Sequence, residues 1–170
     1  GAVVMNAGAY GGEMKDVLTS VRVMTEEGEI MELPAEKLGL GYRTSIIPEK
    51  RYIVLGAVIS LTEGKKEEIK AQMDDLRQKR VSKQPLEYPS AGSTFKRPEG
   101  YFAGKLIQDS GLKGFTVGGA QVSEKHSGFV INKGNATAAD VMELIRQVTA
   151  KVKEDTGVTM EPEVKQIGEF

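Results

Sequence analysis

Three short glycine-containing segments hold most of the side chains suited to chemistry. Asn6–Gly12 is rich in glycine, Arg43 lies within Gly41–Ser45, and Ser93 directly follows Gly92. Backbone without side chains lets N–H groups approach a flat or anionic ligand, an arginine can hold a carboxylate through two hydrogen bonds, and a positioned serine can exchange a proton. From spacing alone, each segment is more typical of an ordinary turn or surface residue.

Several common catalytic arrangements are excluded. The chain has no GxGxxG fingerprint after a strand and no P-loop, and Pro89–Ser93 does not fit the G-x-S-x-G pattern of hydrolases. Cysteine is absent and His126 is the single histidine. Disulfides, cysteine nucleophiles and multi-histidine metal sites are therefore excluded, and we predict no metal site.

Further polar residues follow the serine. Arg97 and Lys113 are basic residues near glycines, a pattern that slightly favours binding of an anion such as a diphosphate over a solvated charged surface. His126 is more typical of a satisfied polar residue than of a catalyst. Glu161 and Glu163 flank a proline, and one of them can point into a site.

Composition limits the function further. The 170 residues carry 23 Lys and Arg against 24 Asp and Glu, a formal net charge of −1 that argues against a general nucleic-acid binder. No apolar run approaches the roughly 20 residues that span a bilayer, and no signal peptide is evident, so we expect a cytoplasmic protein without membrane insertion. The apolar start, Gly1–Met5, suggests a cut through a larger core. The sequence does not indicate the oligomeric state.

The elements expected around these segments are mixed. Residues 21–33 predict a hairpin with a glycine turn, residues 52–61 a buried strand, and residues 63–83 a charged amphipathic helix. The change at residue 62 from strands to helix predicts a domain boundary. We therefore expect an α+β chain with domains at 1–62 and 63–170.

In the second half, the sequence predicts a helix at residues 101–110, short strands at 115–122 and 128–131, and a final strand at 158–167. The best-defined helix follows Thr137, where Thr137 and Asp140 form a capping box, and it ends before Gly157. Its apolar residues recur on one face, as expected of a helix that packs on a core.

Taken together, the motifs resemble the UDP-N-acetylenolpyruvoylglucosamine reductase (MurB) family. Any one motif is weak, but their order and spacing match along essentially the whole chain. The matching segments are Met5–Glu13, Gly41–Ser45, Pro89–Pro98, Gly111–Gly114 and Glu161–Val164, followed by Ile167–Gly168.

The resemblance implies a flavoenzyme of peptidoglycan synthesis. NADPH reduces bound FAD, and hydride then passes to the enolpyruvyl double bond of UDP-N-acetylglucosamine enolpyruvate, giving UDP-N-acetylmuramate. It also implies an FAD-binding part of two subdomains and a C-terminal substrate domain. Residues 1–62 would be the C-terminal part of the FAD-binding domain, and residues 63–170 the substrate-binding domain.

The resemblance also assigns roles to the catalytic candidates. Ser93 matches the proton donor of the family, and Arg43 and Glu163 match the residues that flank the substrate carboxylate. Hydride addition leaves negative charge next to that carboxylate, and the charge requires stabilisation and then a proton. Glu163 would have to be protonated or share a proton, because an ionised carboxylate repels the anion.

The remaining matches concern binding. Asn6, Ala7, Gly8 and Ala9 match backbone that borders the isoalloxazine ring of FAD, and the candidates for substrate contacts are Arg97, Lys113 and His126. The glycine-rich segment for the flavin diphosphate is missing, so we expect this chain to be inactive alone. Two alternatives remain: a nucleotide-sugar binding module without catalysis, and another FAD oxidoreductase. The serine disfavours the first, and the C-terminal motifs disfavour the second.

Overall fold

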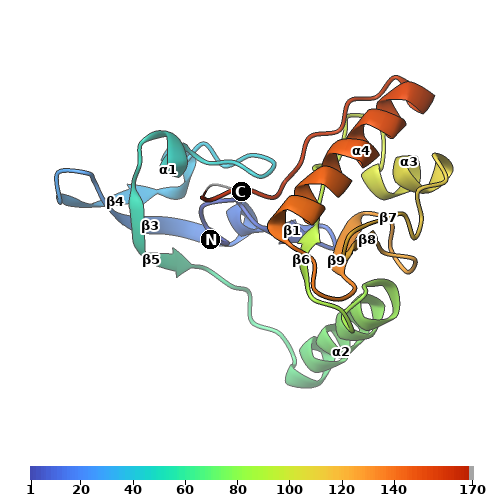
Figure 1. Cartoon of the computed structure of the whole chain (residues 1–170). Coiled ribbons are helices and arrows are strands. Elements are labelled where there is room, and N and C mark those ends of the chain that lie inside the picture. The colour runs from blue at the N-terminus through green and yellow to red at the C-terminus, as the bar shows by residue number, and fades with distance from the viewer. Residues whose placement is uncertain (169–170) are drawn as a thin grey trace. The chain divides into compact units, whose positions relative to one another are not determined.

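The structure, a computed structural model, describes residues 1–168 and divides the chain into two compact units, Gly1–Lys65 and Lys66–Phe170 (Figure 1). Each unit has its own antiparallel sheet and its own cluster of buried apolar side chains. The α+β prediction is therefore confirmed. The assignment of the two units to an FAD-binding and a substrate-binding domain stays a prediction.

A three-stranded sheet forms the centre of the first unit. Its strand order is β4-β3-β5, with both neighbours antiparallel to β3. The predicted hairpin joins β3 to β4, and Gly28 takes the left-handed conformation (φ +85°) that this turn requires. The bounds are β3 Leu18–Met24, β4 Ile30–Pro34 and β5 Ile53–Ile59.

Short elements surround this sheet. Two-residue strands pair as a small hairpin, and three short helices follow along the chain: β1 Gly8–Ala9, β2 Gly12–Glu13, the 3₁₀ helices Met14–Asp16 and Ala35–Lys37, and α1 Ile46–Glu49. The buried residues at the centre of the unit are Leu18, Val21, Val23, Leu38 and Ile47.

Strand β5 forms where the sequence predicts a strand, but the predicted burial is wrong. It is an edge strand, and Ile53 and Val58 expose 55% and 54% of their surface. A run of apolar β-branched residues indicates a strand, whereas burial depends on whether other elements cover it.

The second unit contains a four-stranded antiparallel sheet of order β6-β9-β8-β7. Gly118 and Gly119 form the tight connection between β7 and β8, and a Cβ at Gly119 would lie 2.2 Å from the carbonyl oxygen of Gly134. The bounds are β6 Ser90–Ser93, β7 Thr116–Val117, β8 Ala120–Val122 and β9 Phe129–Asn132.

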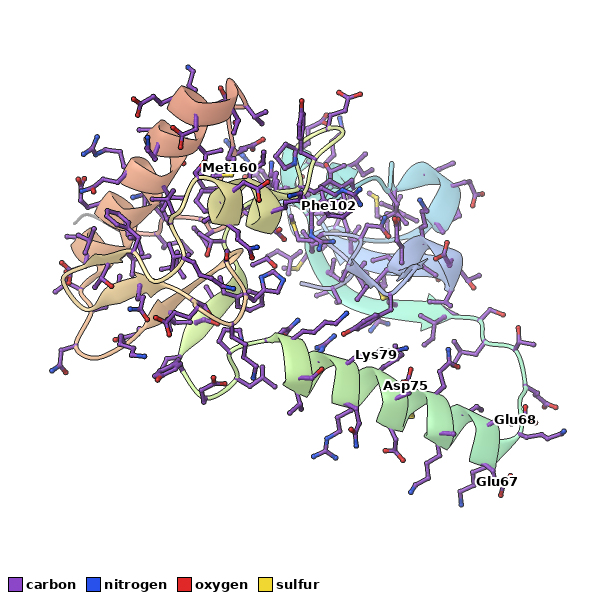
Figure 2. The ribbon with its side chains drawn as sticks, turned by 90° about the vertical axis from the view of Figure 1, so that its right-hand side faces the viewer. Glu67, Glu68, Asp75, Lys79, Phe102 and Met160 are labelled. Carbon is purple, nitrogen blue, oxygen red and sulfur yellow. The ribbon has the colours of Figure 1, made fainter. Side chains whose placement is uncertain are left out.

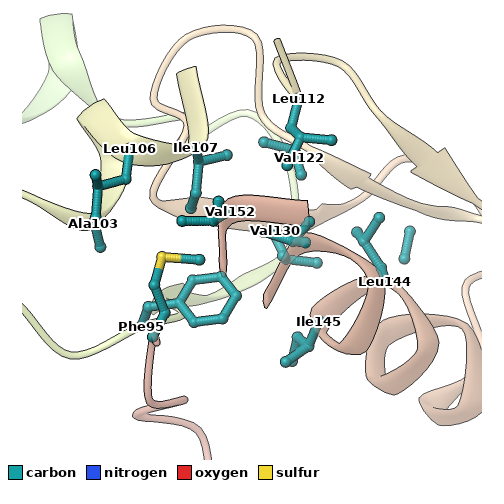
Figure 3. Packing of buried hydrophobic residues seen from close by; sticks show 13 residues of the cluster. Phe95, Ala103, Leu106, Ile107, Leu112, Val122, Val130, Leu144, Ile145 and Val152 are labelled. Carbon is teal, nitrogen blue, oxygen red and sulfur yellow. The ribbon is translucent and has the colours of Figure 1, made fainter. Parts of the chain in front are cut away.

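Helix α4 (Ala138–Thr156) packs against β7 and β8 of this unit's sheet, and α3 (Ala103–Asp109) packs against α4. Figure 3 shows side chains from both helices meeting those of the strands in one apolar cluster. The helix α4 contributes its fully buried stripe, and the tail adds one large side chain: Leu144, Ile145, Val148, Val152 and Met160.

Local signals account for both ends of α4. Thr137 is the N-cap, and its hydroxyl accepts from the Asp140 N–H (3.1 Å) while its own N–H donates to the Asp140 carboxylate (2.9 Å). Gly157 ends the helix with φ +74°. The capping box and the glycine stop were predicted from the sequence, and both are confirmed.

The other long helix, α2 (Lys66–Lys83), forms as predicted but buries none of its residues. Ile69 and Met73 are 46% and 65% exposed, so the expected amphipathic face is not covered. Figure 2 shows its charged side chains along the helix, including Asp75 and Lys79, which pair at 2.6 Å. Within residues 1–168 no helix is both long and apolar enough to cross a membrane.

The tail was predicted to form a strand over residues 158–167, and this is wrong. Only Pro162 forms a bridge, to Phe95. The proline has no N–H to donate, so pairing on either side of it relies on single hydrogen bonds from neighbouring residues.

Candidate functional site

The glycine-rich segment of the first unit forms a narrow hairpin. Gly8 pairs with Glu13, and Ala9 with Gly12, around a turn in which Tyr10 has φ +53° and Gly11 φ +88°. The sequence predicted no regular strand here, so this small ladder is a correction. Ala7 and Ala9 are exposed and Gly8 is half-buried, which leaves the backbone of the segment open to a ligand.

Asn6 differs from the rest of this segment because it is buried, with 1% of its surface exposed. Its side-chain amide donates to the carboxylate of Glu13 (2.7 Å) and to the carbonyl of Gly41 (3.1 Å), and its Oδ1 accepts from the N–H of Lys15 (2.9 Å). The side chain is thus engaged inside the protein, and only the backbone of Asn6 can serve the predicted cofactor contact.

Arg43 lies at the tip of a tight turn. Gly41 and Thr44 exchange backbone hydrogen bonds (3.2 and 3.3 Å), and Arg43 between them has φ +55°. Its guanidinium lies 5.1 Å from the centre of the Tyr42 ring. A left-handed conformation at a non-glycine residue is strained and persists only when neighbouring contacts hold it, an arrangement that is enriched at functional sites.

A carboxylate beside this turn is held in its ionised form. The pKa of Glu13 lies below its ordinary value because Lys15 and Asn6 donate hydrogen bonds to it, and the charge of Arg43 adds to the effect. The same contact raises the pKa of Lys15. The 2.9 Å ion pair between Glu13 and Lys15 therefore stands next to the Arg43 turn at neutral pH.

Ser93 ends the edge strand β6, at a β-bulge. Ser90 pairs with Ile131 and Ser93 with Phe129, so two residues of β6 face one residue of β9. Gly92 in the bulge has φ +90°. The sequence suggested a tight glycine turn here. The structure instead shows a strand with a bulge directly before Ser93, which is exposed.

Thr94 and Gly128 continue the ladder past the bulge. The Thr94 N–H donates to the Gly128 carbonyl (2.8 Å), and the Thr94 hydroxyl accepts from the Val130 N–H (3.0 Å). Thr94 is 3% exposed. The sequence indicated no role for Thr94. Its hydroxyl holds the backbone directly after Ser93 against β9.

Glu163 lies next to Ser93 through the backbone. The Glu163 N–H donates to the Thr94 carbonyl (2.8 Å), and the Lys96 N–H donates to the Glu161 carbonyl (2.9 Å), on either side of the Phe95–Pro162 bridge. Glu161 uses its carboxylate in an ion pair with Lys96. The structure thus places Glu163 beside Thr94, the residue after Ser93, although Ser93 and Glu163 are 70 positions apart in the sequence.

His126 lies on the loop that leads into β9. Its Nδ1 accepts from the Gly128 N–H (3.1 Å), and its ring meets Phe129 edge to face at 4.9 Å. Phe129 is the strand partner of Ser93. A Cβ at Gly104 would lie 3.2 Å from the Gly128 nitrogen, so the start of α3 packs directly on this loop.

Arg97 contacts the two residues that precede α3. Its guanidinium stacks 4.0 Å from the centre of the Phe102 ring, and its Nε donates to the Tyr101 carbonyl (3.2 Å). Phe102, labelled in Figure 2, is the N-cap residue of α3 and is 60% exposed. Sequence reasoning missed this aromatic support because no spacing rule joins the two residues.

Lys113 stands apart from these residues within the second unit. It is exposed and lies in the turn after α3, whereas Arg97 stacks at the helix start. A helix of this length separates its ends by about 10 Å. Among residues 1–168, no group of three or more acidic, histidine or cysteine side chains has the arrangement of a metal site.

Arg43 belongs to the first unit, whereas Ser93, Glu163, Arg97 and His126 belong to the second. The predicted site residues therefore form two local groups, one built on a strained turn and one on a bulged strand edge.

Comparison with known proteins gives a consistent result. Residues 84–167 match a family model described as "UDP-N-acetylenolpyruvoylglucosamine reductase, C-terminal domain". Proteins named UDP-N-acetylenolpyruvoylglucosamine reductase from Agathobacter rectalis and Exiguobacterium sibiricum are 65% and 60% identical, over 100% and 99% of this chain and 54% and 56% of their own lengths.

A crystal structure of UDP-N-acetylenolpyruvylglucosamine reductase (MurB) from Thermus caldophilus superposes with a TM-score of 0.84 at 41% identity, covering 97% of this chain and 58% of that one. The chain spans about half the length of the curated relatives that it matches. Because the family model matches residues 84–167 and the named relatives align along nearly the whole chain, the chain belongs to the UDP-N-acetylenolpyruvoylglucosamine reductase (MurB) family.

Proposed function

We propose that this chain is the substrate-reducing part of a reductase that uses NADPH and FAD to convert UDP-N-acetylglucosamine enolpyruvate into UDP-N-acetylmuramate, in the cytoplasm, for peptidoglycan synthesis. The observation that carries the proposal is the 65% identity to a named reductase over all 170 residues. Because the chain spans 54% of that relative, the complete activity requires the rest of such a protein.

The glycine-rich segment supports an FAD contact through its backbone. Gly12 has open space where a Cβ would stand, so a flat ring can approach the backbone there. By contrast, a Cβ at Gly8 would lie 2.8 Å from the side chain of Glu13. Packing within the protein therefore explains the glycine at this position without a ligand. We assign Asn6, Ala7, Gly8 and Ala9 to this border, and the flavin, when bound, supplies the hydride.

Three side chains then serve the substrate step. Arg43 stabilises the negative charge that develops beside the substrate carboxylate, because its planar fork suits a carboxylate. Ser93 donates a proton to the carbon next to the hydride acceptor. Glu163, whose N–H binds the carbonyl of the residue after Ser93, faces the same carboxylate in a protonated or proton-sharing form.

Basic and aromatic residues of the second unit bind the nucleotide sugar in this proposal. Arg97 is pre-arranged by the Phe102 ring and the Tyr101 carbonyl, so it can hold a diphosphate with little loss of side-chain freedom. His126 contacts Phe129, the strand partner of Ser93, and we assign it to the substrate on that basis and on its sequence match. Lys113 is retained as a substrate contact on its sequence match.

The test uses a complete reductase, made by joining this chain to the part of the Agathobacter rectalis relative that lies outside the matched region. We expect this protein to oxidise NADPH repeatedly only when the enolpyruvyl substrate is present, because NADPH alone reduces each bound flavin once, and we expect mass spectrometry to identify UDP-N-acetylmuramate. Ser93→Ala should slow the substrate step by about 10²–10⁴-fold and leave the NADPH step intact. Stopped-flow absorbance separates the two steps.

The rival function is a nucleotide-sugar binding module without catalysis. It predicts tight binding of the substrate, no turnover, and no effect of Ser93→Ala on any measured rate. Ser60→Ala is the matched control, because Ser60 is an exposed serine of the other unit. If both serine variants behaved alike, the proton-donor role would be lost.

A further inference from the structure

The amide of Asn6 is oriented by three protein groups at once. Both of its N–H groups donate, to Glu13 and to the Gly41 carbonyl, and its oxygen accepts from the Lys15 N–H. An asparagine amide has two donors and one acceptor oxygen, so one orientation satisfies all three partners. With 1% of its surface exposed, the side chain is shielded from competing water.

This amide reaches across the sequence to the turn that carries Arg43. Gly41 accepts the Asn6 hydrogen bond through its carbonyl and also exchanges two backbone hydrogen bonds with Thr44. Residues 42 and 43 form the tip between them. The left-handed conformation of Arg43 (φ +55°) therefore sits on a base that Asn6 holds.

A second side chain attaches the other end of the same turn. Ser45 is 7% exposed, and its hydroxyl donates to the carbonyl of Val4 at 2.6 Å. The turn is thus fastened on one side through Gly41 to Asn6 and on the other through Ser45 to Val4. Both anchoring points lie within residues 4–6, which lead into the glycine-rich segment.

Resting on the proposed function, we propose that Asn6 is a positioning residue for Arg43, which it and Ser45 hold in fixed register with the glycine-rich backbone segment. The pair acts through hydrogen bonds to the backbone rather than by contact with the substrate. One clamp then sets two parts of the site together: the backbone that borders the flavin and the guanidinium that meets the substrate carboxylate.

The first test is Asn6→Asp in the complete reductase. Aspartate keeps the shape and the acceptor for Lys15, but it loses both donors and places a second negative charge against Glu13. We expect the amides of Gly41 and Thr44 to exchange hydrogen faster while the amide of Lys15 stays protected. Unchanged exchange at Gly41 and Thr44 would overturn the clamp, and this readout requires no turnover.

The second test asks whether Asn6 acts through Arg43. Asn6→Asp should slow the substrate step by about 10²-fold, the scale expected for a misplaced catalytic group. In an Arg43→Ala background the same change should have little further effect, because no guanidinium remains to be positioned. Equal losses in both backgrounds would show that Asn6 merely supports the fold, and would overturn the proposal.

Two further variants complete the design. Ser45→Ala should reproduce the loss in part, since it removes the link to Val4 but leaves the Gly41 anchor. Asn135→Asp is the matched control, because Asn135 is an exposed asparagine of the other unit whose backbone is left-handed (φ +56°), as it is at Asn6 (φ +44°). The turnover of this variant should be unchanged. A complete reductase without turnover would contradict the proposed function. Hydrogen exchange at Gly41 and Thr44 would still test whether Asn6 holds the Arg43 turn.

Discussion

The two groups of site residues are held in place by different means. Arg43 is carried on a strained turn whose base is fastened by the buried side chains of Asn6 and Ser45. Ser93 is carried on a strand edge, where backbone hydrogen bonds from Thr94 and Glu163 fix the neighbouring chain. Side-chain anchoring depends on the identity of single residues, whereas backbone pairing tolerates many substitutions. The first group should therefore be the more sensitive to point changes around it.

Gly92→Ala is the change that should most disturb the backbone-held group. Gly92 has φ +90° in the β-bulge, a conformation that an alanine adopts only with strain, so the bulge should shift and move Ser93. We expect about 10²-fold slower substrate reduction in the complete reductase, measured by stopped-flow absorbance.

Gly134→Ala is the control for that experiment, since Gly134 has open space around its missing Cβ and lies in a loop of the same unit. It should react at the rate of the parent protein. If Gly92→Ala did the same, the bulge would not be what positions Ser93.

Thr94→Val should separate stability from activity. The valine has the same shape but no oxygen to accept from the buried Val130 N–H, and an unsatisfied buried donor costs about 1–3 kcal/mol. We expect a lower free energy of unfolding by that amount, measured by chemical denaturation, with turnover below the melting temperature largely retained. Thr94→Ser keeps the hydroxyl and should recover most of the loss.

Asn6→Asp should instead lower both the rate of substrate reduction and the free energy of unfolding, because it removes two hydrogen bonds of a buried side chain and places a charge beside Glu13. A rate loss for Thr94→Val as large as that for Asn6→Asp would remove the distinction between the two groups.

Much of the fold could be predicted from local signals. Thr137, Asp140 and Gly157 act within a few residues of the helix that they bound, so α4 was read correctly from the sequence. The prediction that β5 and the apolar residues of α2 are buried was wrong, because periodicity identifies an element but does not show what covers it. Pro162 similarly limits the tail to one bridge, where the sequence predicted a strand over residues 158–167.

The candidate site likewise contains residues that the sequence indicated and contacts that it did not. The motifs identified Arg43, Ser93 and Glu163 as candidates through a family resemblance, yet no pattern indicated that the Asn6 amide reaches Gly41, 35 positions along the chain. Likewise, no pattern joined Arg97 to the Phe102 ring. Long-range side-chain contacts of this kind depend on the folded backbone, which a single sequence does not reveal.

Phe102→Ala tests whether an aromatic ring orients Arg97, the second arginine proposed to contact the substrate. The ring supports the Arg97 guanidinium at 4.0 Å, and a cation–π contact at an exposed site contributes about 0.5–1 kcal/mol. We expect about two- to fivefold weaker binding of UDP-N-acetylglucosamine, measured by calorimetry on the complete reductase. Phe102→Tyr keeps the aromatic face and should bind like the parent protein. Equal weakening by both variants would mean that stacking does not orient Arg97.

The smallest expected effect is the pH dependence of the side-chain-held turn. The pKa of Glu13 is lowered from 4.5, first by the hydrogen bond from Lys15 and then by that from Asn6, so the folded state favours the ionised carboxylate. A depressed pKa gives stability that is present above the unfolded value of 4.5 and is lost as pH falls through the lower folded value. Because Glu13 is solvent-accessible, the contribution is modest.

Glu13→Gln tests this assignment. Glutamine can still accept from Asn6 but carries no charge for Lys15, so the variant should unfold at a lower temperature than the parent protein near pH 7. The difference should shrink as the pH is lowered below 4.5, where the parent carboxylate takes up its proton. Glu99→Gln, at an exposed position of the other unit, controls for the loss of one surface charge. A difference between Glu13→Gln and the parent that stayed constant from pH 7 to pH 3 would mean that ionisation of Glu13 does not support the base of the Arg43 turn, and the contact with Asn6 would then act through its shape alone.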